Sequence, residues 1–201
     1  MIYFLNKNKQ LSSIYWHLSG ANQQQAEVKM ENKIEIRRAT EKDIALIAAI
    51  GRKTFEETFR DTNTEDDMRK YISENFTDEK IAGEISGRES VFLIAIHDGA
   101  AAAYMKLNTG NAQTEKQGDA LEIQRLYVAA SKKGMGIGKR MIASAEEIAR
   151  ERGLCRIWLG VWEHNEPALA FYKKCGFTVF SSHDFVLGTD RQTDLLMEKN
   201  I

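Results

Sequence analysis

Hydrophobic and polar residues follow strand-like and helix-like patterns along most of the chain. Apolar runs of strand length predict strands at 34–36, 91–96, 101–107, 121–128, 156–161, 177–187 and 193–197. Apolar residues at helical spacing predict helices that begin near Thr40, Thr64, Asp78, Ile137 and Asn165. This order of elements predicts an α/β fold, a mixed and mostly antiparallel sheet of about seven strands flanked by helices.

The segment 121–128 changes its apolar face halfway along. Leu121 and Ile123 are apolar at odd positions, whereas Leu126 and Val128 are apolar at even positions. Side chains alternate between the two faces of a strand, so this switch predicts one extra residue near 124–126, a β-bulge. The alternative is an ordinary strand with one misplaced polar residue. Bulges leave backbone groups unpaired and are frequent next to active sites.

Residues 1–29 lack this patterning, and we expect a poorly ordered N-terminal extension there, with a short docking helix as the alternative. No stretch within it has the ~7–15-residue apolar region of a signal peptide. The patterned part, 30–201, is expected to form a single domain. Its cytoplasmic location is a further expectation.

Composition narrows the class of protein. The chain has 201 residues with 28 Lys+Arg and 29 Asp+Glu, a net charge of −1. This balance argues against a strongly basic nucleic-acid-binding protein and against an acidic disordered chain. No apolar run approaches the ~18 residues of a membrane span. The four histidines and two cysteines form no metal-ligand spacing, so no metal site is expected. From the charge balance and the short apolar runs, neither nucleic acid nor a membrane is expected as a partner.

A glycine-rich loop follows the segment 121–128 and leads into a helix. It reads Lys133-Gly134-Met135-Gly136-Ile137-Gly138-Lys139. Such a loop directs backbone N–H groups and a helix N-terminus at an anion, typically a phosphate. The segment 125–140 carries five basic side chains and no acidic one, which favours the same ligand. The spacing fits neither the dinucleotide fingerprint nor the P-loop. A solvated glycine-rich turn is the alternative.

Two motifs resemble those of the GNAT superfamily of N-acetyltransferases. Leu126-Tyr127-Val128 with the glycine loop resembles motif A of that superfamily, R/Q-x-x-G-x-G/A, although Lys133 stands where Arg or Gln is usual. Asn165, Ala168 and the string Phe171 to Phe177 resemble the second half of the cofactor site. The resemblance covers about 34–199. The strings at 158–163 and 192–197 further resemble the bacterial PaiA-type spermidine/spermine acetyltransferases.

The resemblance implies a bulged and splayed fourth strand and a function in acetyl transfer. The acetyl group would move from acetyl-CoA to a primary amine, such as spermidine or spermine, by direct attack in a ternary complex. The alternatives are a protein or peptide N-acetyltransferase and a non-catalytic acyl-CoA-binding regulatory module. The implied cofactor-binding residues are Leu126, Tyr127, Val128, Lys133, Gly134, Met135, Gly136, Ile137, Gly138, Lys139, Asn165, Tyr172 and Lys174.

Two residues are candidates for catalysis. Tyr172 resembles the general acid of the superfamily, since a phenol with a pKa near ~10 keeps its proton at neutral pH. A core tyrosine is the alternative. Glu122 lies on the bulged strand and is the candidate base, acting directly or through water. A solvent-facing strand glutamate is the alternative, and Glu163, His164 and His97 are weaker candidates. The Leu126 N–H is the candidate oxyanion donor.

The acceptor side is predicted from charge. The segment 56–67 contains six acidic side chains and one Arg, and a wall of this kind would attract a polycationic amine. The predicted substrate-binding residues are Glu57, Asp66, Asp67 and Glu122, while an ordinary solvated charged face is the alternative. Asp194, Tyr104 and Trp162 are further candidates that the sequence does not place. A homodimer through the edge of a terminal strand is also left open.

Overall fold

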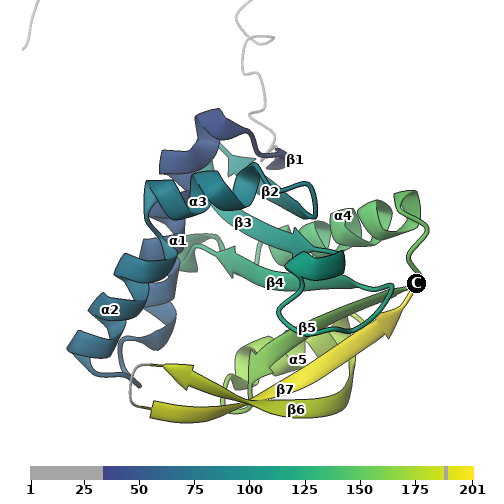
Figure 1. Cartoon of the computed structure of the whole chain (residues 1–201). Coiled ribbons are helices and arrows are strands. Elements are labelled where there is room, and N and C mark those ends of the chain that lie inside the picture. The colour runs from purple at the N-terminus through teal and green to yellow at the C-terminus, as the bar shows by residue number, and fades with distance from the viewer. Residues whose placement is uncertain (1–33, 188–189) are drawn as a thin grey trace, which may run out of the picture. The chain divides into compact units, whose positions relative to one another are not determined.

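This computed structural model describes residues 34–187 and 190–201. A seven-stranded sheet forms the centre of this part of the chain (Figure 1). The strand order is β1-β2-β3-β4-β5-β7-β6, and only the β4–β5 pair is parallel. This confirms the predicted mixed, mostly antiparallel sheet. The predicted extension at 1–29 lies outside the described residues. The strands are β1 (Ile34–Arg38), β2 (Ser90–His97), β3 (Ala100–Asn108), β4 (Leu121–Val128), β5 (Arg156–Trp162), β6 (Thr178–Leu187) and β7 (Asp190–Asn200).

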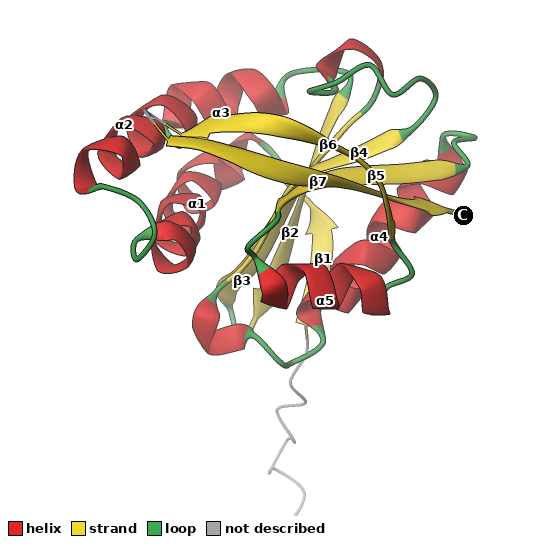
Figure 2. Cartoon of the chain, turned by 90° about the horizontal axis from the view of Figure 1, so that it is seen from below, coloured by secondary structure: helices red, strands yellow, loops and turns green. Residues whose placement is uncertain are grey.

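Helices cover both faces of the sheet, as the view from below shows (Figure 2). The first face carries α1 (Ile44–Phe59), α2 (Glu65–Asn75) and α3 (Asp78–Ile85), and the second carries α4 (Ile137–Glu151) and α5 (Glu166–Lys174). Side chains of β2 alternate between the two resulting cores, which explains its continuous apolar sequence. No helix in the described ranges is long and apolar enough to cross a membrane.

The predicted bulge is present in β4. Lys106 of β3 pairs with Arg125, whereas the next residue, Leu107, pairs with Ile123, so Gln124 is the extra residue. The bulge lets residues on both sides of it pack into one core: Leu121, Ile123, Leu126 and Val128 all contact the cluster beneath α4. The bulge therefore explains the change of apolar face in the sequence.

The β4 and β5 strands separate soon after they meet, which confirms the predicted splay (Figure 1). They pair only at Leu121 with Ile157 and at Glu122 with Trp158. Beyond these positions β5 continues along β7 as far as the pair Trp162–Asp194. Among the described strands, none pairs with the rest of β4 on its β5 side. The sheet therefore opens between β4 and β5, with backbone N–H and C=O groups of β4 facing the opening.

Candidate active site

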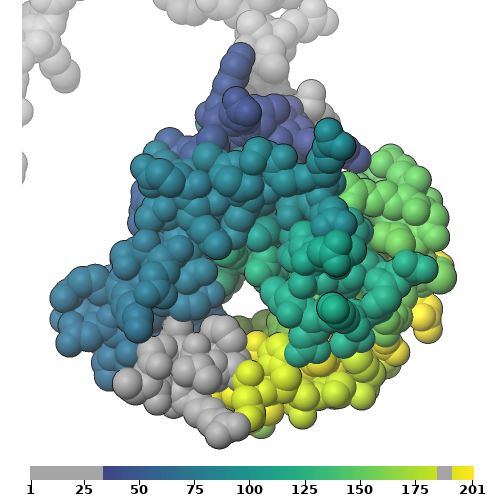
Figure 3. All heavy atoms as spheres, viewed as in Figure 1, coloured from purple at the N-terminus to yellow at the C-terminus, as the bar shows by residue number. Residues whose placement is uncertain are grey.

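A cavity of about 650 Å³ lies where β4 and β5 separate. This volume is typical of a small-molecule site. In the space-filling view the surface is hollowed between the blue helices, the green strands and the yellow strand pair (Figure 3). Two groups of lining residues differ in kind. We call the first the glycine-loop wall, formed by Leu126, Tyr127, Val128, Lys132, Lys133, Gly134, Gly136, Ile137, Gly138 and Lys139. The second is the aromatic wall, formed by Phe55, Phe59, Tyr71, Trp162 and Asp194.

The glycine-loop wall is built largely from backbone. Gly134 and Gly136 have φ angles of 81° and 78°, a left-handed conformation that other residues adopt only at a cost. Gly136 is the N-cap of α4 and offers no side chain to the first N–H groups of the helix. The first turn of α4 has no acidic residue, and three lysines line the same wall. This arrangement suits a bound phosphate or other anion.

Close packing of α4 against α5 brings a second motif to the cavity. A Cβ atom at Gly138 would lie 3.1 Å from Cζ of Phe171, a tighter contact than most Cβ atoms make, so glycine suits this close approach of the two helices. Asn165 caps α5 by accepting a hydrogen bond of 3.3 Å from the N–H of Ala168. Asn165, Phe171 and Tyr172 all line the cavity.

Tyr172 is a buried phenol at the cavity. Its ring packs against Phe171 and Phe177, with centroid distances of 5.2 Å and 5.7 Å. Burial raises the pKa of Tyr172 well above its ordinary value, so the hydroxyl keeps its proton at neutral pH. Within the described residues the Tyr172 hydroxyl has no hydrogen-bond partner. It is therefore available to donate a proton to a ligand in the cavity.

The aromatic wall is assembled from side chains of four elements. Phe55 stacks on Tyr71 of α2 with a centroid distance of 4.5 Å, and Phe59 lies 6.4 Å from Trp162 of β5. Asp194 of β7 pairs directly with Trp162 across the sheet. Among the described lining residues Asp194 is the one carboxylate, and burial raises its pKa. Aromatic faces beside a carboxylate suit a cation.

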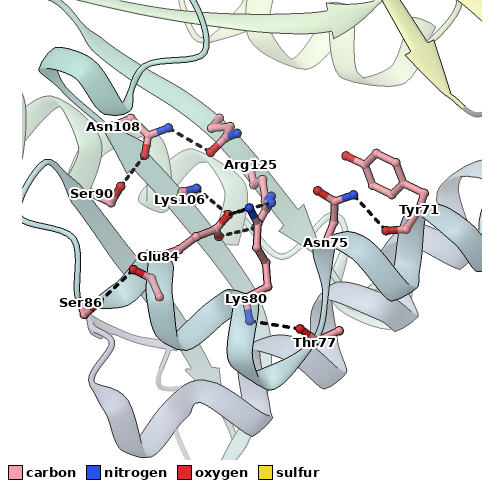
Figure 4. Close-up of polar contacts among 12 residues, drawn as sticks. Tyr71, Asn75, Thr77, Lys80, Glu84, Ser86, Ser90, Lys106, Asn108 and Arg125 are labelled. Atoms are coloured by element: carbon pink, nitrogen blue, oxygen red, sulfur yellow. Dashed lines mark hydrogen bonds and ion pairs between the residues drawn. The ribbon is translucent and has the colours of Figure 1, made fainter.

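A buried ion-pair cluster anchors β4 next to the bulge (Figure 4). The guanidinium of Arg125 lies 2.9 Å from the carboxylate of Glu84 in α3, and the ammonium of Lys106 lies 3.0 Å from the same carboxylate. Burial lowers the pKa of Lys106. The amide of Asn108 donates to the side chain of the bulged residue Gln124 at 3.0 Å. These contacts fix the bulge and hold Arg125 in the cavity lining.

Glu122 requires a correction, because the structure does not bring it to the cavity. Its side chain is only 2% exposed, and Glu122 is not among the described residues that line the cavity. The carboxylate accepts hydrogen bonds from Asn108 Nδ2 at 2.8 Å, from the N–H of Thr114 at 3.0 Å and from the Thr114 hydroxyl. These bonds hold the loop between β3 and β4. The sequence-based role of Glu122 as a base and acceptor-binding residue is therefore not supported by its position.

The predicted acidic wall also requires correction. Glu57 accepts a hydrogen bond of 3.2 Å from the N–H of Ala130, and Asp67 bonds to Thr64 at the start of α2. The side chain of Asp66 is 91% exposed and lies 3.3 Å from Arg69. None of the three acidic residues belongs to the described lining, because their carboxylates serve helix ends and the surface. Exposed Met135 and Lys174 lie outside this lining as well.

Several lining residues carried little signal in the sequence. Phe55 and Phe59 of α1 have the helical spacing of ordinary core residues, and they do pack in the core beneath α1, yet they also face the cavity. Trp162 and Asp194 were candidates that the sequence could not place, and both line the cavity. Tyr104, the third such candidate, is fully buried in the core beneath α1 and is not among the described lining residues.

Comparison with known proteins gives a consistent result. The model of the acetyltransferase (GNAT) family matches residues 52–177. An uncharacterized N-acetyltransferase of Lactobacillus delbrueckii subsp. lactis is 43% identical over 167 residues, 83% of this chain and 96% of the relative. The spermidine N(1)-acetyltransferase of Thermoplasma acidophilum is 26% identical over 160 residues, 77% of this chain and 95% of the relative.

The fold has a solved counterpart. The crystal structure of the PaiA N-acetyltransferase from Thermoplasma acidophilum in complex with coenzyme A superposes with a TM-score of 0.71. The identity is 26%, and the match covers 84% of this chain and 99% of that one. In the described residues no group of three or more His, Cys, Asp or Glu side chains could hold a metal ion.

Proposed function

Because this chain belongs to the GNAT acetyltransferase family and is an acetyl-CoA-dependent N-acetyltransferase, we propose that its acceptor is a polyamine such as spermidine or spermine. The amine attacks the thioester directly in a ternary complex. The observation that carries this proposal is that two unlike walls line one cavity. One wall suits the phosphates of acetyl-CoA, and the other suits an ammonium group. Two substrates held in one cavity react without a separate diffusional encounter.

The glycine-loop wall supplies the cofactor-binding residues of this proposal. The pyrophosphate binds at the N–H groups between Lys133 and Lys139 and at the start of α4. The extended pantetheine arm pairs with the free side of β4 along Leu126–Val128, like an added strand. Asn165 and Tyr172 flank the arm. Met135 and Lys174, which lie outside the described lining, have no part in this assignment.

Two groups then act at the reacting atoms. The Leu126 N–H stabilises the oxyanion of the tetrahedral intermediate, a contribution that is typically worth about 10²–10³-fold in rate. The Tyr172 phenol gives its proton to the leaving thiolate. No cysteine is found among the described lining residues, since Cys155 is exposed and Cys175 lies outside the lining. This supports direct attack over transfer through an acyl-cysteine.

The choice of a polyamine rests on the relatives and on the aromatic wall. A spermidine N(1)-acetyltransferase is among the relatives, and PaiA is a structural neighbour. The segment 56–67 no longer contributes to this argument, because its predicted binding residues lie outside the described lining. The reactive ammonium instead has one carboxylate, Asp194, and the ring faces around it.

Release of free thiol from acetyl-CoA tests the proposal. The acceptor panel contains spermidine, spermine, simple diamines, a monoamine of matched length, lysine peptides and aminoglycosides. We expect kcat/KM to be highest for spermidine or spermine. Higher kcat/KM for lysine peptides would replace the polyamine with a protein acceptor. Acetyl-CoA binding without turnover of any amine would indicate a non-catalytic acyl-CoA-binding module and contradict the proposal.

A further inference from the structure

We propose that Asp194 binds the acceptor ammonium and takes its proton, and that His183 and Glu115 are positioning residues that pass this proton toward solvent. The inference rests on the amine acetylation proposed above. It replaces Glu122, the base expected from the sequence, by a residue that lines the cavity.

Asp194 occupies a central place in the splayed half of the sheet. It lies on β7 between β5 and β6, directly opposite Trp162 on one side and His183 on the other. Side chains of directly opposed residues in antiparallel strands share a face of the sheet. The neighbouring position on β5 is Gly160, where an added Cβ would lie 3.5 Å from Oδ2 of Asp194. The absence of a side chain at Gly160 leaves space beside this carboxylate for an ammonium group.

An imidazole connects Asp194 to a second carboxylate. Nε2 of His183 lies 3.8 Å from Oδ2 of Asp194, and its Nδ1 bonds to Oε1 of Glu115. The side chain of Asp194 is 18% exposed, whereas that of Glu115 is 33% exposed. The three groups therefore lead from the cavity to a more exposed position. A carboxylate on one ring nitrogen orients the imidazole and leaves the other nitrogen to exchange a proton with Asp194.

The loop that carries Glu115 is held firmly in place. Gln113 accepts a hydrogen bond of 2.6 Å from the indole N–H of Trp158. Thr114 donates two hydrogen bonds to Glu122, one from its backbone and one from its hydroxyl. The buried carboxylate of Glu122 thus fixes the residue next to Glu115. In this inference Glu122 supports the loop, and it does not contact the substrate.

The surroundings of Asp194 favour its action as a base. Burial raises the pKa of Asp194, and a higher pKa makes a carboxylate a better proton acceptor near neutral pH. The titratable groups that interact with Asp194 are His183 from β6 and Tyr71 from α2. Arg125 from β4 lines the same cavity and pairs with Glu84. Charge on His183 opposes the effect of burial and lowers the pKa of Asp194.

The proton balance is complete without a further reactant. The ammonium gives one proton to the Asp194 carboxylate, and the neutral nitrogen attacks the thioester carbonyl. A C–N bond forms, and the C–S bond then breaks. The thiolate takes the phenol proton of Tyr172, which is restored by the second proton of the nitrogen. One net proton leaves from Asp194 through His183 to solvent.

The test measures kcat/KM for the amine against pH, with saturating acetyl-CoA, in the whole protein. For Asp194→Asn we expect a loss of about 100-fold or more at neutral pH. The loss should shrink as the pH approaches the pKa of the amine, about 10 for an alkylamine, because a neutral amine needs no base. The KM for acetyl-CoA should stay within about twofold. Asp66→Asn, the same change at an exposed position outside the described lining, is the matched control and should match the wild type.

A second variant tests the positioning role. His183→Gln removes the charge that lowers the pKa of Asp194, so the acidic limb of the pH profile should move to higher pH. Glu115→Gln should lower kcat by about 3–10-fold, less than the loss at the base itself. If Asp194→Asn does not fold, Gly160→Leu provides the same test, since its side chain would cover the carboxylate.

Two results would overturn the inference. One is an Asp194→Asn variant that stays within about threefold of the wild type across the pH range. The other is a His183→Gln variant whose acidic limb does not move. These outcomes differ from failure of the proposed function, in which the wild-type protein itself would release no thiol with any polyamine.

Discussion

The two walls of the cavity are built on different principles. The glycine-loop wall comes from one continuous stretch, 126–139, and presents mainly backbone N–H groups and a helix end. The aromatic wall takes side chains from α1, α2, β5 and β7, which are far apart in the sequence. The first wall depends on the local conformation of a few residues, and the second depends on how the sheet opens. Substitutions should therefore affect the two substrates separately.

Tyr172→Phe should give the largest effect, because Tyr172 acts where the two substrates meet. Loss of the phenol proton donor should lower kcat by about 10²–10³-fold. The buried ring and its packing against Phe171 and Phe177 are retained, so acetyl-CoA binding should change little. Steady-state kinetics and calorimetric binding of acetyl-CoA measure the two quantities. Unchanged kcat in the variant would remove Tyr172 from the chemistry.

Gly136→Ala should weaken acetyl-CoA binding by about 5–30-fold, since a left-handed alanine costs about 1–2 kcal/mol and the loop must shift to relieve it. The KM for the amine should stay near its wild-type value. Gly99→Ala is the matched control. Gly99 has a similar φ angle of 76°, lies in the β2–β3 turn and is not among the described lining residues. It should lower the free energy of unfolding without changing either KM.

Trp162→Ala should weaken binding of the amine and leave binding of acetyl-CoA unchanged, the opposite of Gly136→Ala. A cation–π contact is worth about 0.5–2 kcal/mol, so the KM for the amine should rise by about 2–30-fold. Binding of acetyl-CoA should be preserved, and Trp162→Phe should recover part of the loss. Equal changes in both KM values would show that the two walls are not separate.

Lys133→Ala should have the smallest effect, a rise of about 2–5-fold in the KM for acetyl-CoA at low salt. The difference from the wild type should shrink above about 0.15 M ionic strength, where charges are screened beyond ~8 Å. Lys174→Ala, at an exposed position outside the described lining, should leave this KM unchanged. A Lys133 effect that persists at high salt would argue against a screened charge contact.

Much of the fold could be predicted from the sequence because its signals are local. The change of face between Ile123 and Leu126 predicts an extra residue at 124–126, and Gln124 is that residue. Three alternating glycines after the strand located the loop that lines one wall. The misassignment of Glu122 has an equally clear cause. A carboxylate beside a bulge has the same pattern in the sequence whether it faces a ligand or the amides of a buried loop.

What the sequence determined by itself was the order of elements, the bulge and the glycine-loop wall, since strand alternation, helix capping and left-handed glycines each involve only a few neighbouring residues. Only the tertiary structure decided which carboxylate faces the cavity. Asp194 lines it because β5 leaves β4 and pairs with β7, a register set by packing over the whole sheet. Glu57, Asp66 and Asp67 instead face helix ends and the surface. The sequence shows that a residue is charged but not which way its side chain points, and only the fold determines that orientation.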